Sequence, residues 1–350
     1  MSTYRIAVTG EYARADGSTA FGDIGLSRLT EAGAEWEVIP VPDPVIDGGT
    51  VADFDALFVL GPKSVTAETL RSAPRVRHVA RFGAGYDAID VGALSAAGVL
   101  LTHTPAAVRR PMVQATLAML FATTHNLVAK DHSVRAGDWS ARERWRGRGL
   151  DRSKIGLVGL GGIGGDVARA LVALGLDVQA YNRTPRPELV AKIGIEQVAL
   201  AQLMRTSDVV IVLVSANSGT RRLIDGDLLR SMPAGSTFVN MARGAVVDES
   251  ALIEQLRSGA IASAGLDVFE YEPLPVSNPL VGMPNVVLSP HSLCWTDDFA
   301  AAVSDSAIAA LLDVKEGRVP EHVVNPEVLA LRERRTGSRN SARTTEGNER

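Results

Sequence analysis

Arg243 is placed where a side chain could bind a carboxylic acid. It stands near the end of Val239-Asn-Met-Ala-Arg-Gly244, directly after an apolar run. A guanidinium there can bind a carboxylate through two parallel hydrogen bonds and polarise an adjacent carbonyl group. An arginine before a glycine is also common on protein surfaces, so this segment alone leaves both interpretations open.

Two further segments place titratable groups after apolar runs. Residues 265–273, GLDVFEYEP, hold Asp267, Glu270 and Glu272, and Ser289-Pro-His291 holds the histidine with the best context of the six. A carboxylate close to an imidazole favours the protonated ring, which can then donate or accept a proton near neutrality. These segments therefore predict acid–base chemistry next to a carboxylate-binding arginine.

The element that has to position this chemistry runs from Lys154 to Thr184. An apolar run at 155–158 leads into a G-x-G-x-x-G turn, an amphipathic segment and a second apolar run at 178–181. In a strand–turn–helix–strand unit the first glycine makes the tight turn, the second admits a pyrophosphate and the third lets the helix pack on the strand. The helix N-terminus also attracts phosphate. The predicted dinucleotide site comprises Gly159, Gly161, Gly162, Ile163 and Gly164.

The end of the second strand, Asn182-Arg183-Thr184, bears on the choice of cofactor. A carboxylate at this point usually accepts hydrogen bonds from the adenosine ribose and thereby selects NAD. Here Asn182 is neutral, Arg183 offers a guanidinium that fits phosphate, and Thr184 adds a hydroxyl group. We therefore predict that NADP(H) is favoured and NAD(H) possible; the alternative is that Arg183 points to solvent and NAD is used.

Strand-like and helix-like stretches alternate along most of the 350 residues, which predicts the α/β class. We expect two doubly wound parallel-sheet domains, Rossmann-like or flavodoxin-like. Proline-containing junctions at Thr102-His-Thr-Pro105 and Ser289-Pro290 indicate where the chain passes between them. The predicted domains are 1–102 with 295–330 and 103–294, followed by a disordered polar tail at 331–350.

Composition limits the partners. The charge of −4 and pI near 5.9 argue against nucleic acid, although the basic segment 135–154 contains two tryptophans; we interpret it as a solvated loop or an oligomer surface. A long apolar helix is expected before it, at 112–129. Cys294 is the sole cysteine, and no zinc-type spacing exists, so we expect no metal. Without a signal peptide or a membrane-spanning run, a cytoplasmic protein is expected.

Residues 81–87, RFGAGYD, place two glycines after a strand. Backbone N–H groups there could hold a carboxylate, although a simple turn is the alternative. Together with GLGGIG, the stretch NMARGAVVDESALIEQLRSGAIASAGLDVFEYEP and SPH, this motif resembles the D-isomer-specific 2-hydroxyacid dehydrogenase family, which includes glyoxylate/hydroxypyruvate reductases and phosphoglycerate dehydrogenases. The similarity covers Arg5 to about Pro326.

The resemblance implies a split substrate-binding domain, an inserted cofactor domain and an active site in the cleft between them. It implies reversible reduction of a small 2-keto acid to the D-2-hydroxy acid by a nicotinamide cofactor. By motif position, Arg243 would bind the carboxylate and carbonyl of the substrate, and His291, oriented by Glu272, would transfer the proton. Other implied contacts are those of Ala84 and Gly85 with the carboxylate and of Asp267 with the nicotinamide. Such enzymes are typically homodimers built through the cofactor domain.

Departures from the family pattern leave the pocket and cofactor open. Asn182 replaces the usual acid, His103 replaces an asparagine, Gln114 replaces a glutamate, and Ser215-Ala216 lacks a proline. Two alternatives share the fold: an NAD(P)-responsive, corepressor-like binding protein, and a formate- or phosphite-type dehydrogenase. The substrate is not specified. Arg109 and Arg110 either pair with a second anionic group of the substrate or face solvent, and we favour the latter.

Overall fold

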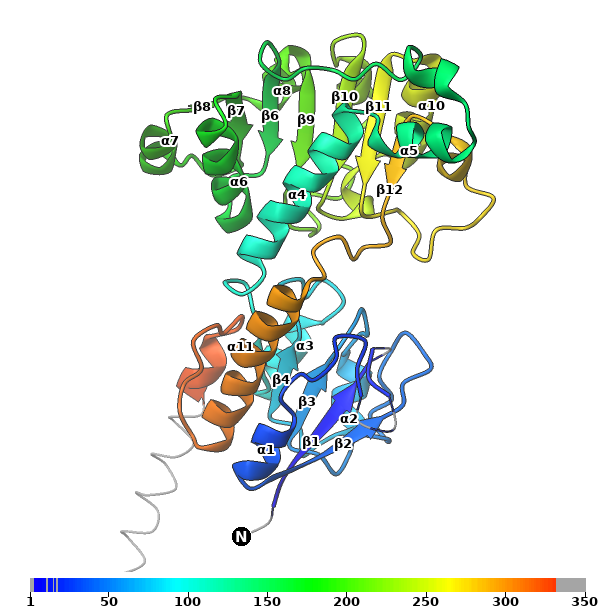
Figure 1. The fold of residues 1–350 in the computed structure, drawn as a ribbon. Helices are drawn as coiled ribbons and strands as arrows, with labels where there is room; N and C mark the ends of the chain where they lie inside the picture. Colours follow the sequence, from blue (N-terminus) through cyan, green and yellow to red (C-terminus); the bar gives the residue numbers. More distant parts are fainter. Residues whose placement is uncertain (1–2, 11, 15, 17, 332–350) are drawn as a thin grey trace, which may run out of the picture. The chain divides into compact units, whose positions relative to one another are not determined.

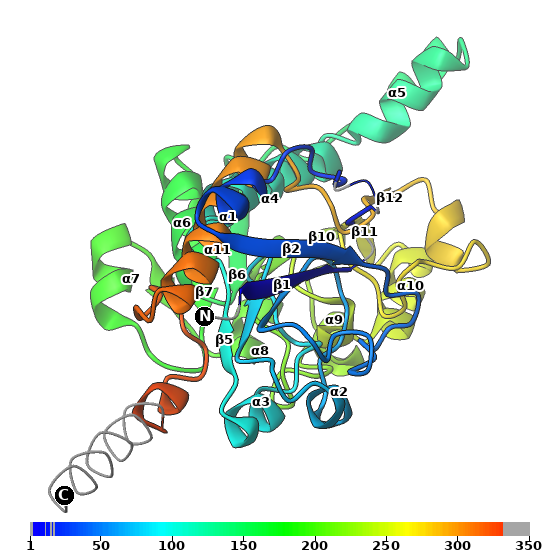
Figure 2. The same ribbon diagram turned by 90° about the horizontal axis from the view of Figure 1, so that it is seen from below.

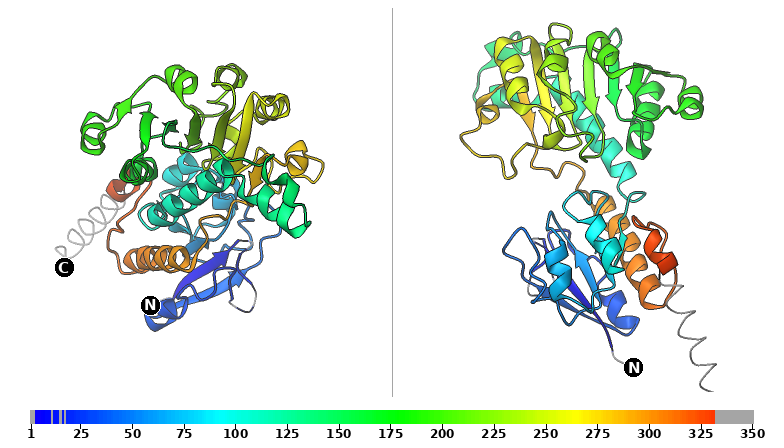
Figure 3. Two further views of the ribbon diagram at one scale, coloured as in Figure 1. Left: turned by 45° about the horizontal axis from the view of Figure 1, so that its top comes forward. Right: turned by 180° about the vertical axis from the view of Figure 1, so that it is seen from behind.

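The computed structural model describes residues 3–10, 12–14, 16 and 18–331, and the chain divides into two compact units. The first unit extends to Val108 and resumes at Trp295, and the second is Arg109–Cys294. Each has its own parallel sheet (Figures 1 and 3). The predicted division at 102/103 precedes the observed 108/109 by six residues, which lead into the first helix of the second unit. Residue 331 is helical, and the rest of the predicted disordered tail lies outside the described residues.

The first unit contains five parallel strands in the order β2-β1-β3-β4-β5, which is the flavodoxin-like order. All four residues of β3 are buried, because helices cover both faces of such a sheet. Its elements are β1 (Tyr4–Thr9), α1 (Ser27–Glu31), β2 (Ala34–Ile39), β3 (Ala56–Val59), α2 (Ala67–Ser72), β4 (His78–Arg81), α3 (Val91–Ala97), β5 (Leu100–Thr102) and α11 (Asp297–Lys315).

The second unit contains seven parallel strands in the order β12-β11-β10-β9-β6-β7-β8. The order reverses between β6 and β9, which is where open α/β sheets bind ligands. Its helices before the sheet are α4 (Arg109–Thr124), α5 (Leu127–Arg135) and η1 (Trp139–Arg142). Then follow β6 (Lys154–Val158), α6 (Gly162–Ala173), β7 (Asp177–Tyr181), α7 (Pro187–Ile193), β8 (Glu196–Gln197), α8 (Leu200–Thr206), β9 (Val209–Val212), α9 (Gly226–Arg230), β10 (Ser236–Asn240), η2 (Gly244–Val246), α10 (Glu249–Ser258), β11 (Ile261–Leu266), η3 (Pro279–Gly282) and β12 (Val286–Leu288). The predicted doubly wound α/β class is thus confirmed in both units.

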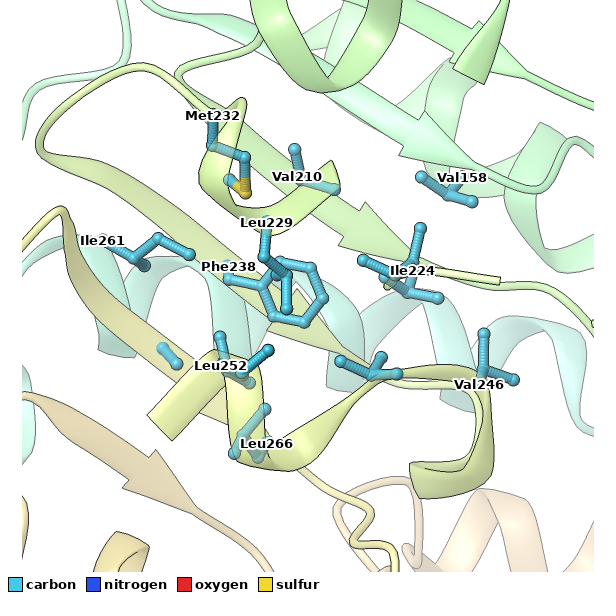
Figure 4. Packing of buried hydrophobic residues seen from close by; sticks show 14 of the residues in the cluster. Val158, Val210, Ile224, Leu229, Met232, Phe238, Val246, Leu252, Ile261 and Leu266 are labelled. Atoms are coloured by element: carbon cyan, nitrogen blue, oxygen red, sulfur yellow. The ribbon is translucent and has the colours of Figure 1, made fainter. Parts of the chain in front are cut away.

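Two apolar layers hold the sheet of the second unit. Helices α4 and α6 pack on one face, and α8, α9 and α10 pack on the other. In the second layer Phe238 of β10 is completely buried and lies among Leu229 and Leu252 (Figure 4). Burial of such side chains contributes roughly 1.5–3 kcal/mol each, so both layers fix the strands whose ends carry the site.

The predicted helix at 112–129 is wrong in its extent. Helix α4 ends at Thr124, and α5 begins at Leu127 after Asn126, which adopts the left-handed conformation at φ 52°. Asparagine tolerates this conformation better than most residues, so the chain can turn here. Consequently α5 extends outward from its own sheet (Figure 2). Within the described part of the chain, no helix is both long and apolar enough to cross a membrane.

Candidate active site

The predicted site residues of the second unit follow the carboxyl ends of its strands. Gly159 follows β6, Asn182 follows β7, Arg243 follows β10, Asp267 follows β11 and His291 follows β12. Because all these strands are parallel, their ends lie along one edge of the sheet. Residues up to 132 positions apart in the sequence are therefore gathered along this edge.

The carboxylate of Glu272 and the imidazole of His291 are directly paired. Nδ1 of His291 lies 2.7 Å from Oε2 of Glu272, and the other oxygen, Oε1, accepts the backbone N–H of Phe269 at 3.0 Å. Burial would raise the pKa of the Glu272 carboxyl, but the hydrogen bond and charge of His291 hold this pKa below its usual value. When Nδ1 donates its proton to the Glu272 carboxylate, Nε2 is left as the ring nitrogen available to a ligand, because it bonds no other described residue.

Asp267 holds the turn that carries His291. Its Oδ1 accepts the backbone N–H groups of Ser292 at 3.1 Å and Leu293 at 3.2 Å. His291 itself adopts φ 55°, a strained conformation for a non-glycine residue that its surroundings must impose. Burial raises the pKa of the Asp267 carboxyl despite these hydrogen bonds. The resemblance did not indicate this positioning contact, and a contact between Asp267 and nicotinamide stays a prediction.

Arg243 is placed by a loop that packs tightly against the Glu272 loop. The buried Asn240 side chain donates to the carbonyl of Arg243 at 3.1 Å and accepts the N–H of Ala242 at 3.0 Å. At Gly244 a Cβ would lie 1.9 Å from the carbonyl atoms of Phe269, so only glycine permits this approach. The charge of Arg243 acts on the Glu272 carboxyl and contributes to its lowered pKa. The structure thus brings Arg243, Glu272 and His291 into one electrostatic group.

Glu249 is a residue of the site region that sequence reasoning missed. It is buried, its Oε2 accepts the N–H of Glu270 at 2.9 Å, and its Oε1 accepts the side chain of Asn278 at 2.8 Å. Both contacts fix the loop that carries Glu272. In the sequence Glu249 looks like an ordinary acidic residue in the first turn of a helix, so no local signal could have revealed its contacts.

Cys294 lies near this group, and its thiol stays protonated at neutral pH. Burial and the nearby Asp267 charge raise the pKa of its thiol to about 12, so almost no thiolate exists at neutral pH. Among the residues that the structure describes, no cluster of three or more histidine, cysteine or acidic side chains could hold a metal ion.

The glycine turn has the geometry that a dinucleotide requires. Gly159 adopts φ 112°, and a Cβ at Gly164 would lie 2.0 Å from the Gly159 carbonyl oxygen, so helix and strand meet through glycine alone. A Cβ at Gly161 would meet no described atom within 4 Å, which leaves the approach to the turn open. Gly162 and Ile163 begin α6, whose first N–H groups are available to phosphate. These residues fit a nicotinamide dinucleotide.

Asn182 contacts the protein on both sides of its amide. Its Oδ1 accepts the N–H of Leu160 at 3.0 Å, and its Nδ2 donates to the carbonyl of Thr184 at 2.7 Å. The side chain therefore ties the end of β7 to the glycine turn. Arg183 is exposed, and its Nη1 lies 3.6 Å from the position of a Cβ at Gly219. The Arg183 guanidinium is thus at the surface, near Gly219. Contacts of Asn182 and Arg183 with a cofactor stay predictions.

In the first unit, the predicted carboxylate-binding loop is held by its carbonyl groups. The ring of His103 donates from Nδ1 to the Ala84 carbonyl at 2.9 Å, and Nε of Arg81 donates to the Gly85 carbonyl at 3.0 Å. Burial lowers the pKa of His103, an effect that outweighs this hydrogen bond. The N–H groups of Ala84 and Gly85 bond no other described residue, as an anion site would require. His103, noted as a departure from the family pattern, thereby acquires a positioning role.

The two adjacent arginines differ in their surroundings. Arg109 is partly buried and pairs through Nε with Oδ2 of Asp166 at 2.7 Å, whereas Arg110 is exposed. Both stand at the start of α4 in the second unit. Arg110 is thus exposed, as expected, whereas Arg109, whose side chain is 40% exposed, is also held by Asp166.

Comparison with known proteins identifies relatives of this chain. Residues 117–292 match the model of the D-isomer specific 2-hydroxyacid dehydrogenase NAD-binding domain. The glyoxylate reductase of Korarchaeum cryptofilum is 35% identical over 315 residues, covering 88% of this chain and 94% of that protein. The glyoxylate/hydroxypyruvate reductase B of Escherichia fergusonii is 34% identical over 314 residues, covering 87% and 96%.

A solved structure shows the same fold. The NADPH-dependent glyoxylate/hydroxypyruvate reductase of Sinorhizobium meliloti, in complex with NADP and malonate, superposes with a TM-score of 0.79 at 29% identity and covers 93% of this chain and 98% of that one. The fold and site define an NAD(P)-dependent oxidoreductase. The chain belongs to the D-isomer specific 2-hydroxyacid dehydrogenase family, which confirms the resemblance inferred from its motifs.

Proposed function

We propose that this enzyme reduces a small 2-keto acid to the D-2-hydroxy acid, reversibly. The observation that carries the proposal is the 2.7 Å pair between Glu272 and His291 at the same sheet edge as Arg243. The curated relatives named glyoxylate reductase support this substrate class. Their names do not favour the corepressor-like alternative or the formate- or phosphite-type alternative.

The proposed roles follow from the geometry. Arg243 binds the substrate carboxylate and polarises the carbonyl, because its planar guanidinium can donate to both oxygens. Protonated His291 donates from Nε2 to the carbonyl oxygen as the alcohol forms, and Glu272 holds the ring through Nδ1. The N–H groups of Ala84 and Gly85 contribute further donors to the carboxylate. When bound, the reduced nicotinamide supplies the hydride that the carbonyl carbon accepts.

We also propose that NADPH is the preferred cofactor. A neutral Asn182 at the end of β7 does not repel a 2′-phosphate, and Arg183 offers it a guanidinium. The NADP complex of the Sinorhizobium meliloti reductase supports this choice. A charge-assisted contact of roughly 1.5–3 kcal/mol would favour NADPH by about one to two orders of magnitude.

A homodimer in the cytoplasm completes the proposal. Helix α5 exposes Leu127, Val128 and Val134, and Trp139 of η1 is also exposed. Helix α5 projects from its unit (Figure 2), and exposed apolar side chains on such a helix are typical of an interface. We propose that this surface pairs with that of a second copy, which would accord with the basic segment 135–154 being an oligomer surface. The cytoplasmic location is proposed from the sequence alone, and cell fractionation would test it.

A substrate screen tests the proposed reaction. Glyoxylate, hydroxypyruvate, pyruvate and oxaloacetate are offered with NADH and NADPH, and formate and phosphite with the oxidised cofactors, while absorbance of the reduced nicotinamide is followed. We expect turnover of at least one keto acid, and His291→Ala should lower kcat roughly 10²- to 10⁴-fold. His125→Ala, at an exposed histidine outside α5, is the matched control. Native turnover in the His291 variant, or oxidation of formate or phosphite alone, would refute the proposal.

A further inference from the structure

A hollow of about 170 Å³ lies beside the first turn of α6 and is rich in arginine. Three side chains with permanent positive charge reach it from α4, from α6 and from the segment before α7. The lining residues are Arg109, Gly161, Gly162, Gly165, Arg169, Arg186 and Leu189. Among the described residues, Asp166 is the one carboxylate that forms ion pairs with these arginines. Three guanidinium groups against one carboxylate leave the hollow suited to an anion.

Asp166 fixes two of the three guanidinium groups in place. Its Oδ2 accepts Nε of Arg109 at 2.7 Å, and its Oδ1 accepts Nη1 of Arg169 at 2.7 Å. This pairing uses only one nitrogen of each guanidinium. The terminal nitrogens of Arg109 donate to no other described residue, and its side chain is 40% exposed. Arg109 is thus held by one edge while its other edge can bind a ligand.

Gly162 gives Arg109 its access to the helix start. A Cβ at residue 162 would lie 3.5 Å from Nε, 3.6 Å from Cδ and 3.7 Å from Cζ of Arg109. The Arg109 guanidinium therefore lies beside the first residue of α6. It borders the space that a larger side chain at position 162 would occupy. The unpaired N–H groups at this helix end favour a negative ligand at the same place.

The position of Arg186 identifies which phosphate group fits. Arg186 stands four residues after Asn182, on the segment that follows β7, and that segment meets the adenosine ribose in Rossmann-type domains. The hollow is bounded by this segment and by the glycine turn, the two parts of a Rossmann-type domain that meet the adenosine ribose and the pyrophosphate. We propose that Arg109 and Arg186 bind the 2′-phosphate of NADP(H). This inference rests on the proposed function, since it requires the dinucleotide to lie on the glycine turn, and it assigns Arg109 to the cofactor.

Binding of nucleotide fragments to the full-length enzyme tests the assignment without turnover. Adenosine 2′,5′-bisphosphate and adenosine 5′-monophosphate are titrated calorimetrically into the wild-type enzyme and into Arg109→Ala, Arg186→Ala and Arg110→Ala. We expect each of the first two variants to bind the bisphosphate about 10- to 100-fold more weakly, the loss expected for a charge-assisted contact. Their affinity for the monophosphate should be unchanged. The matched control, Arg110→Ala, removes an equal charge from the exposed neighbour and should bind both probes like the wild type.

Two results would overturn the assignment. Unchanged bisphosphate affinity in both variants would exclude the hollow as the site of the 2′-phosphate. Equal losses of affinity for the bisphosphate and the monophosphate would place the guanidinium groups at the 5′-phosphate. Arg186→Ala guards against a folding defect in Arg109→Ala, because Arg186 forms no ion pair with another described residue. Keto-acid turnover is measured separately. If the wild-type enzyme reduces keto acids but the two variants do not lose bisphosphate affinity selectively, this inference is refuted while the proposed function stands.

Discussion

Asp267 is a buried carboxylate that holds the turn carrying His291 at a cost in stability. Only 3% of the residue is exposed, and Oδ1 accepts two backbone N–H groups from the turn after His291. Burial nevertheless raises the pKa of the carboxyl, because the charged form loses more hydration than these hydrogen bonds replace. The turn is therefore held by a group whose ionisation opposes folding.

This cost predicts a pH-dependent effect of Asp267→Asn. A raised folded-state pKa gives a contribution to stability that is present below the ordinary value of 3.8 and is lost as pH rises through the folded-state pKa. Asparagine keeps an oxygen for the two N–H groups but does not titrate. The melting temperature of the variant should therefore gain on that of the wild type as pH rises above 3.8 and through the folded-state pKa. Parallel melting temperatures across that range would contradict this account.

At the scale of elements, two loops from neighbouring strands meet at Gly244. The Arg243 loop follows β10 and the Glu272 loop follows β11, and a Cβ at Gly244 would lie 1.9 Å from the carbonyl of Phe269 and 2.3 Å from the nitrogen of Glu270. All of these are backbone atoms, which cannot rotate away as a side chain could. This contact therefore limits how far apart the loops that carry Arg243 and Glu272 can lie.

Gly244→Ala should force the two loops apart. Overpacking of this kind costs typically 1–3 kcal/mol of stability, and a displacement of about 1 Å between catalytic groups can lower the rate roughly 10²-fold. Thermal unfolding and kcat/KM with the best keto acid from the screen would measure both effects. Gly282→Ala is the control, because its Cβ would meet no described atom within 4 Å. A Gly244 variant with native kinetics would show that the contact does not set the catalytic geometry.

The elements that the sequence predicts best are buried strands and their glycine turns. Strands expected at 236–240 and 261–266 coincide with β10 and β11, because a parallel strand covered on both faces reads as an apolar run. The sequence does not show contacts between distant side chains, such as Arg109 with Asp166, 57 residues apart. It also concealed the break between α4 and α5 at Asn126, because the apolar residues continue past this position although the helix does not. Motif position grouped Arg243, Glu272 and His291, and the structure pairs Glu272 with His291. The contacts of Asp267 and Glu249, which hold these loops, could be found only from the fold.

At the scale of the whole molecule, the proposed homodimer depends on the projecting helix α5. Leu127 and Val134 are 58% and 56% exposed, which is unusual for apolar residues on an ordered helix. In a two-fold dimer each side chain is buried twice, once in each copy. Burial of one such side chain is worth roughly 1.5–3 kcal/mol, so the two copies of one residue contribute about 3–6 kcal/mol.

Replacing one of these residues with a charged one should therefore dissociate the dimer. We expect Leu127→Asp to weaken self-association by at least about 10²-fold, which sedimentation velocity over a range of protein concentrations would detect as a shift to the monomer. Val276→Asp is the control, because Val276 is 88% exposed on a loop outside α5. Circular dichroism would show that both variants stay folded. A wild-type chain that sediments as a monomer at every concentration, or a Leu127→Asp dimer as tight as the wild type, would show that α5 is not the interface.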